Sequence, residues 1–195
     1  MTEQQPYDVI EAFDTFELRR YPEHVVAQVQ VSGTFDSAGN SAFGALFGYI
    51  TGENESRDSI EMTAPVQQQA APDTAPKSES MAMTAPVTQT RAGDGRYVVA
   101  FVLPATMTVE NAPTPANPAV SIRVVPEQFA AAVTYSGRGS ASAYDKHVGE
   151  LLTGLAAAGL TPEGAPSSAR FDAPSKPWLL RRNEVVQPVE APDAR

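Results

Sequence analysis

The sequence contains no cysteine among its 195 residues. This absence excludes disulfide bonds, thiolate nucleophiles, iron–sulfur clusters and cysteine-ligated zinc. It fits a reducing compartment, so we expect a cytoplasmic protein. Only two histidines are present, His24 and His147, and a metal site built from several imidazoles is therefore excluded as well.

Long apolar runs and positive charge are also scarce. No apolar run approaches the roughly 20 residues that a membrane span needs, so we expect no membrane span. Lys and Arg number 14 against 23 Asp and Glu, a net charge of −9. Because nucleic-acid binding needs a concentrated basic face, we expect no nucleic-acid partner. With 42% hydrophobic and 19% charged residues, the chain has the composition of one globular domain, either a binding protein or an enzyme.

The sequence does contain an internal duplication. Residues 18–33 align without a gap on residues 122–137, with seven of the sixteen positions identical. In each copy a Pro-Glu pair, beginning at Pro22 and at Pro126, separates two short runs of strand-forming residues. Such a pair is a turn signal, so each copy is predicted to be a β-hairpin.

A helical pattern follows each predicted hairpin. In the first copy, apolar residues recur at helical spacing and form one stripe: Phe43, Leu46, Phe47 and Ile50. In the second copy the same spacing recurs 105 residues later: Val148, Leu151, Leu152 and Leu155. We expect Asp36 or Ser37 to cap the first helix, and Gly52 and Gly159 to end the two helices. The order of elements predicts an α+β fold of two duplicated β-α-β units, with helices packed on an antiparallel sheet.

Other segments have simpler interpretations. Residues 67–80 are rich in Gln, Ala, Pro and Ser and are expected to form a mobile loop. Residues 97–103 form an apolar run that predicts a strand ending before a proline. The polar tail after Val186, and residues 188–195 above all, is expected to be disordered.

Four short motifs carry a family resemblance. They are FELRRY at 16–21, YITGEN at 49–54, IEMTAPV at 60–66 and RRNEV at 181–185. Their order and spacing resemble the SOUL/haem-binding-protein family over residues 6–187. The resemblance implies one domain with internal repeats at about 16–66 and 120–186. It further implies a pseudo-twofold, distorted antiparallel β-barrel with two flanking helices, in a soluble protein that binds haem or other porphyrins.

A porphyrin has a flat apolar face and two propionates, so it needs an apolar wall and cations. Phe43 and Phe47 would form the wall, although such a stripe also packs as core, and core and groove can share it. The resemblance implies that a loop containing Phe171, Lys176 and Trp178 faces this helix across a shallow groove, with the lysine meeting a propionate. The predicted site residues are thus Asn40, Phe43, Phe47, Phe171, Lys176 and Trp178.

The sequence offers few residues that could ligate the iron of a haem. Some family members have a histidine where this chain has Arg20, and arginine is a poor ligand because it stays protonated. Members that bind porphyrin well carry basic residues near Asn40 and Gly48, and neither is basic here. His24 and His147 remain as axial candidates, although a lone histidine is more often structural or solvated. For three methionines we favour core packing over thioether ligation: Met62, Met81 and Met83.

The sequence therefore predicts binding or carriage of haem (haem b) or another tetrapyrrole. The protein would hold the ligand by its faces and propionates, without strong axial ligation of the iron. An enzyme acting on a small apolar or porphyrin-like compound is an alternative, because the duplicated fold also resembles effector-binding domains of multidrug-responsive regulators. Its acid–base groups would be Glu61, Glu184 and Tyr49, but no Ser-His-Asp signature is present, so we expect binding over catalysis. A protein-interaction module using the same groove is a third hypothesis.

The RRNE motif at 181–184 is expected to tie a strand to the hairpin by salt bridges. The oligomeric state is not predicted.

Overall fold

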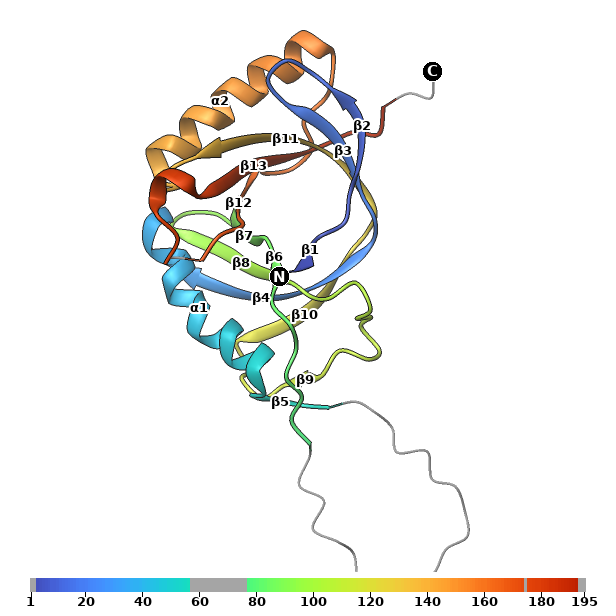
Figure 1. Cartoon of the computed structure of the whole chain (residues 1–195), viewed down its shortest axis with the longest axis vertical. Helices are drawn as coiled ribbons and strands as arrows, with labels where there is room; N and C mark the ends of the chain where they lie inside the picture. Colours follow the sequence, from blue (N-terminus) through green and yellow to red (C-terminus); the bar gives the residue numbers. More distant parts are fainter. Residues whose placement is uncertain (1–2, 57–76, 174, 193–195) are drawn as a thin grey trace, which may run out of the picture.

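The computed structural model describes residues 3–56, 77–173 and 175–192. Nine antiparallel strands form one sheet that curls into a half-barrel, with two helices on its outer side (Figure 1). The predicted α+β class is confirmed. The strands of this sheet are β2 Asp8–Ala12, β3 Glu17–Tyr21, β4 His24–Ser32, β7 Val87–Arg91, β8 Arg96–Val102, β10 Val120–Val125, β11 Gln128–Ser136, β12 Ser167–Arg170 and β13 Arg182–Val189.

The remaining elements are α1 Phe35–Thr51, α2 Ala141–Ala158, the 3-10 helix η1 Trp178–Leu180, and four two-residue strands. Of these strands, β1 Glu3–Gln4 pairs with β6 Thr84–Ala85, and β5 Asn54–Glu55 pairs with β9 Thr114–Pro115. None of the helices in the described ranges is long and apolar enough to cross a membrane.

The duplication appears as a pseudo-twofold arrangement of the sheet. Its order is β10-β4-β8-β7-β12-β13-β11-β3-β2. The first half contributes β4-β8-β7 with α1, and the second contributes β12-β13-β11 with α2, so the two halves mirror one another about the β7–β12 pair. The strand predicted at 97–103 is β8.

The hairpin prediction was wrong, although the strands were right. Tyr21 pairs with Gln128, and His24 pairs with Val125, so the two copies exchange their first strands. A two-residue hairpin loop needs a positive φ at its first or at both central residues. Pro22 and Pro126 stand at that position, and proline fixes φ near −65°. Each Pro-Glu pair therefore carries the chain across to the other half of the sheet.

The helix ends were predicted in part. Thr34, not Asp36 or Ser37, is the N-cap of α1, and Ser37 completes a capping box by bonding back to Thr34. The Asp36 carboxylate instead accepts a hydrogen bond of 3.1 Å from the backbone N–H of Ala141, which joins the starts of the two helices. Gly52 and Gly159 end the helices as expected.

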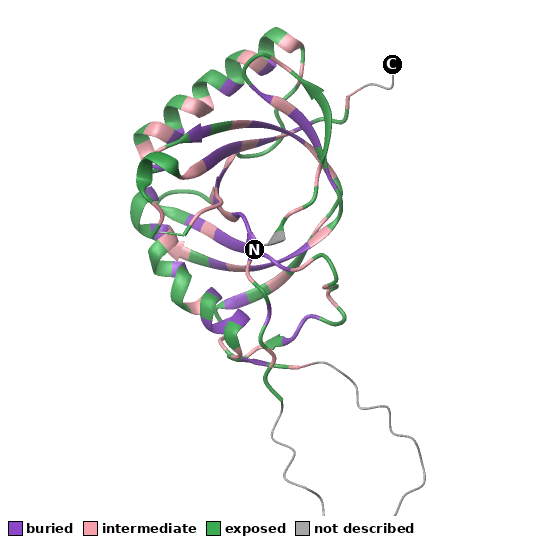
Figure 2. Ribbon diagram, in the orientation of Figure 1, coloured by how far each residue is buried: buried purple, intermediate pink, exposed green. Residues whose placement is uncertain are grey.

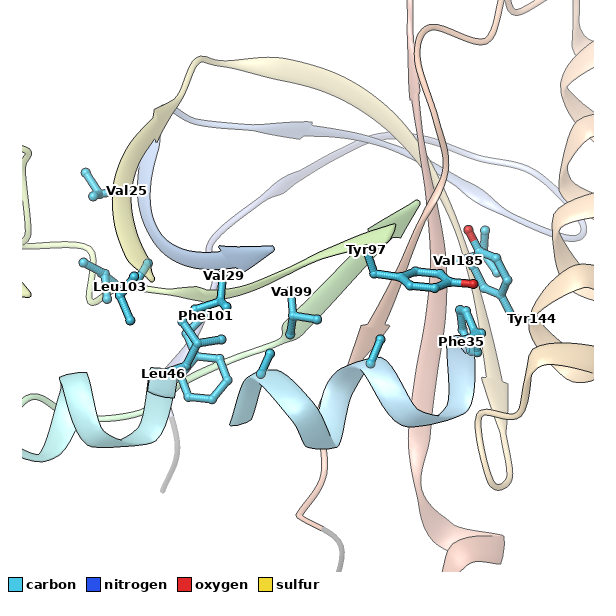
Figure 3. Close-up of a cluster of buried hydrophobic side chains, with 14 of the residues drawn as sticks. Val25, Val29, Phe35, Leu46, Tyr97, Val99, Phe101, Leu103, Tyr144 and Val185 are labelled. Atoms are coloured by element: carbon cyan, nitrogen blue, oxygen red, sulfur yellow. The ribbon is translucent and has the colours of Figure 1, made fainter. Parts of the chain in front are cut away.

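The main core lies between the outer face of the sheet and the helices. Leu46 of α1 packs with Val99 and Phe101 of β8 (Figure 3). Where α1 and α2 begin, the ring of Phe35 stacks on that of Tyr144 at 4.8 Å. Alternate residues of each strand enter this core, so the residues between them face the concave side.

Two segments differ from the sequence prediction or fall outside the description. Pro188 and Val189 were expected in a disordered tail, but they belong to β13, and Val189 is buried opposite Phe129. Residues 57–76, which include Glu61, Met62 and most of the predicted loop, lie outside the described residues. At the far end of that loop, the backbone of Glu79 is held by the side chain of Asn54.

Candidate functional site

The helical stripe of α1 divides between core and surface. Leu46 and Ile50 are buried, whereas Phe43 and Phe47 are 40% and 44% exposed. The two phenylalanine rings stack with centroids 5.4 Å apart, and the Phe43 ring also meets buried Phe101 edge-on at 5.8 Å. Figure 2 shows exposed residues along this outward side of the helix. The pair is thus a fixed aromatic surface in contact with solvent.

The space beside this aromatic pair is open, and α1 itself contains no basic residue. A Cβ added at Gly44 would meet nothing within 4 Å, so a flat molecule can approach the rings there. Asn40, one turn before, is exposed. Gly48 is covered by the carboxylate of Glu53, which is an acidic group where the resemblance implies a basic one.

The loop after β12 supplies a second apolar surface on the helix side of the sheet (Figure 1). Trp178, Leu179 and Leu180 of η1 are 45%, 62% and 65% exposed. The guanidinium of Arg138 lies 5.2 Å from the Trp178 ring. No sequence pattern indicates this cation, because a cation–π contact between a turn and a distant loop leaves none.

The start of the loop lies against α1. A guanidinium nitrogen of Arg170 lies 3.6 Å from the position of a Cβ on Gly39, and the same group lies 6.0 Å from the Phe35 ring. Phe171, however, lies beneath the guanidinium of Arg182 at 4.1 Å and lines a cavity on the concave face of the sheet. The structure does not bring Phe171 together with Phe43 and Phe47.

Lys176 already has a partner. Its ammonium group lies 2.7 Å from the carboxylate of Asp172. That carboxylate also accepts a hydrogen bond of 2.6 Å from the backbone N–H of Arg182. The bond from Lys176, and then the one from Arg182, lower the pKa of Asp172. An anionic ligand would meet Lys176 beside Asp172 or in its place, because the ammonium group has three N–H donors and the side chain is 41% exposed.

The two histidines lie elsewhere. The Nδ1 of His24 is 2.9 Å from the carbonyl oxygen of Pro22, so Nδ1 donates, and its Nε2 accepts from the Gln5 amide at 3.0 Å. Burial lowers the pKa of His24, which keeps the ring neutral. His147 bonds Glu150 at 2.7 Å and stacks on Tyr135. Within the described ranges, no three His, Asp or Glu side chains cluster as metal ligands would.

The RRNE motif forms the predicted salt bridges. Glu184 of β13 is buried and accepts hydrogen bonds from Arg19 of β3 at 2.8 and 3.2 Å, and from Arg182 and Thr134. Burial favours protonation of Glu184, but the bonds from the two arginines outweigh it and keep the pKa below its usual value. A carboxylate held in this way is fixed in its ionised form and is unsuited to proton transfer.

Other residues considered for chemistry are engaged in the structure. The Tyr49 hydroxyl is buried and donates to the Pro113 carbonyl oxygen at 3.0 Å. Met81 is buried and Met83 partly buried against the main core, as the packing interpretation predicts.

Part of the sequence is similar to a known protein. Heme-binding protein 2 of Mus musculus is 38% identical over 76 residues, which are 38% of this chain and 37% of that protein. The match thus spans little more than a third of the relative's length.

Solved structures share the fold at low identity. The C-terminal domain of EcmrR has a TM-score of 0.61 at 13% identity, covering 94% of this chain and 98% of that one. A hydrolase from Listeria innocua has a TM-score of 0.57 at 11% identity, with coverages of 93% and 94%. These two likenesses show the fold alone.

The model of the SOUL heme-binding protein family matches residues 2–188, nearly the whole length. Its span includes the four motifs, both helices and all of the curled sheet except Val189 at the end of β13. The chain therefore belongs to the SOUL heme-binding protein family.

Proposed function

We propose that this chain binds haem or a related tetrapyrrole on the outer surface made by Phe43, Phe47 and Trp178. The stacked and exposed pair of phenylalanine rings is the observation that carries the proposal. Such a pair offers a flat ligand an apolar face without any rearrangement, and burying it recovers roughly 25 cal/mol for each Å² of apolar surface removed from water.

The propionates would be met by cations of the 171–182 loop and its neighbour. Arg138 is exposed beside Trp178. Lys176 would exchange Asp172 for a propionate, which replaces one partly exposed ion pair by another and changes the free energy by about 0–1 kcal/mol. Asn40 would add a hydrogen bond at the end of the aromatic wall, and the charge-poor α1 explains why we expect the propionates toward the loop.

Haem bound here would supply a redox-active iron, and the chain would hold the macrocycle by its faces. Neither histidine belongs to this surface, because His24 faces the concave side and His147 packs on Tyr135. We therefore propose binding without strong axial ligation by a histidine. Metal-free protoporphyrin should then bind about as tightly as haem.

The test is a titration of the protein with haem b, followed by Soret absorbance. The double variant Phe43→Ser/Phe47→Ser should weaken binding by roughly tenfold or more. The control is Leu152→Ser on α2, at the position that the repeat makes equivalent to Phe47 and with a similar exposure of 39%. Unchanged affinity in the double variant would overturn the proposal.

A second measurement tests the absence of axial ligation. The variants His24→Ala and His147→Ala should leave the Soret maximum and the affinity for haem unchanged. A lost or shifted Soret band in one of them, in a folded protein, would show that this histidine ligates the iron.

A further inference from the structure

The concave side of the sheet holds a cavity of about 300 Å³, on the opposite face from α1 and α2. It lies within the curl of the half-barrel, whose helices are all on the outer side (Figure 1). Its volume is at the lower end of the range for ligand pockets, which suits a compound of one or two rings.

Equivalent residues of the two halves face each other across this cavity. The repeat aligns Tyr21 with Val125 and His24 with Gln128, and all four line the cavity. The strand registers likewise make Val98 of β8 the counterpart of Glu184 of β13, because Val29 pairs with Val99 as Val133 pairs with Val185. The cavity is therefore centred on the pseudo-twofold axis.

Its two walls nevertheless differ in chemistry. In the first half, the strands present a mainly aliphatic wall, in which Gln28, Thr88 and Thr90 are the polar members: Val26, Val98, Ala100, Val102 and Val125 make up the rest. In the second half, Glu184 lies beside Tyr21 and Tyr7, whose rings are 5.5 Å apart. A ligand that fills the cavity would meet apolar surface at one side and hydroxyl and carboxylate groups at the other.

The charges of the polar wall are balanced within the protein. Arg19 divides its hydrogen bonds between Glu17, Glu184 and the Tyr21 hydroxyl, and Arg182 also bonds Glu184. Two guanidinium groups thus face two carboxylates. Among the described residues that line the cavity, Glu184 is the only Asp, Glu, Lys or Arg, and its charge is already paired. A charged ligand would therefore gain no counter-ion there, so the wall favours an uncharged ligand.

Hydrogen-bonding groups remain available at the cavity. Across the described part of the chain, the side-chain amides of Gln28 and Gln128 bond to no other residue. Both are partly buried, and each amide offers a donor and an acceptor to a ligand. Because buried polar groups are normally hydrogen-bonded, these two half-buried amides suit a ligand that carries an amide or a similar polar group.

We infer that this cavity is a second binding site, separate from the outer aromatic surface, for an uncharged one- or two-ring compound that carries an amide or a similar polar group. The ring system would lie on the valine wall. The polar group would meet the amides of Gln28 and Gln128. Haem would not compete, because its proposed surface lies on the other side of the sheet.

Three probes with the same ring system test the charge preference by isothermal titration calorimetry: 2-naphthamide, 2-naphthoate and 2-naphthylmethylammonium. The neutral amide should bind, and the anion and the cation should bind at least roughly tenfold more weakly. No binding of 2-naphthamide, or equal binding of all three probes, would overturn the inference.

Variants test the location. Gln28→Met and Gln128→Met keep the side-chain shape but remove the amide. Each should lower the affinity for 2-naphthamide by about fivefold. The matched control is Gln30→Met, on the same strand but outside the cavity lining. Ala100→Phe should fill the cavity and abolish binding. Binding that survives all three cavity substitutions would place the compound elsewhere.

The two sites are separated by competition. Saturation with haem, or the Phe43→Ser/Phe47→Ser substitution, should leave the affinity for 2-naphthamide unchanged. If haem displaces the probe, the cavity is not an independent site. If 2-naphthamide binds while haem does not, the cavity stands and the proposed haem function fails.

Discussion

The two helices occupy equivalent places in the duplicated fold and present different surfaces. Helix α2 carries three charged residues, which form the pairs Lys146–Glu150 and Asp145 with Arg91 of β7. On α1, Asp36 is the only charged residue, and the outward face shows the stacked Phe43–Phe47 pair. Duplication thus supplied one scaffold twice, and only one copy leaves a flat aromatic surface open to a ligand.

The same contrast recurs on the concave face. Arg19 and Arg123 are equivalent in the repeat, yet Arg19 is buried against Glu184 whereas Arg123 is exposed. The counterpart of Glu184 is Val98, so the first half has no carboxylate at this place. One half of the cavity is therefore held by an ion cluster and the other by aliphatic packing.

The largest predicted effect is on stability. Arg19→Met should lower the free energy of unfolding by about 1–3 kcal/mol, because buried Glu184 loses one of its two guanidinium partners. Arg123→Met, the same change at the equivalent site, should change it by only about 0.5 kcal/mol or less. Urea denaturation of both variants measures the difference. Equal losses would mean that the two halves are not held differently.

The second prediction concerns acid. The pKa of Glu184 is lower in the folded than in the unfolded chain, so the unfolded chain binds the proton first as the pH falls. The stabilisation is fully present above the ordinary glutamate pKa of about 4.3 and is lost progressively below it. The urea midpoints of the wild type and of Glu184→Gln should therefore converge in this acid range. A constant gap would show that the charge of Glu184 does not contribute.

The smallest predicted effect is a gain in haem affinity. Asn40→Lys adds a cation at the exposed end of the aromatic wall, where a propionate can reach it. About 0.5–1 kcal/mol is expected from one exposed ion pair, which is a two- to fivefold increase in a Soret titration. Ala156→Lys, at an exposed position of α2, controls for net charge. An equal gain in both variants would indicate general electrostatic attraction.

Some of the site was visible in the sequence. The spacing of the stripe predicted that α1 has an apolar side that includes Phe43 and Phe47. The division of the stripe into buried Leu46 and exposed Phe47 could not be derived, because it depends on which side of α1 packs on β4 and β8. The same holds for Lys176, whose partner Asp172 is near in sequence but is fixed by the backbone of Arg182 in another strand.

The strand pairing shows the limit most clearly. Local propensity placed the strands correctly around Pro22 and Pro126, but the prediction that each Pro-Glu pair is a hairpin turn was wrong. Which strand pairs with which is a contact between residues more than a hundred positions apart, as for Tyr21 with Gln128.

The sequence by itself determined the duplication, the positions of the repeated strands and of the two helices, and the aromatic pair on the first helix, because these follow from local periodicity and repeated residues. The tertiary structure decided the exchange of strands between the halves, the exposure of that pair and the charge-balanced cavity. Each of these depends on long-range packing, which sets burial and hydrogen-bond partners that no local pattern encodes.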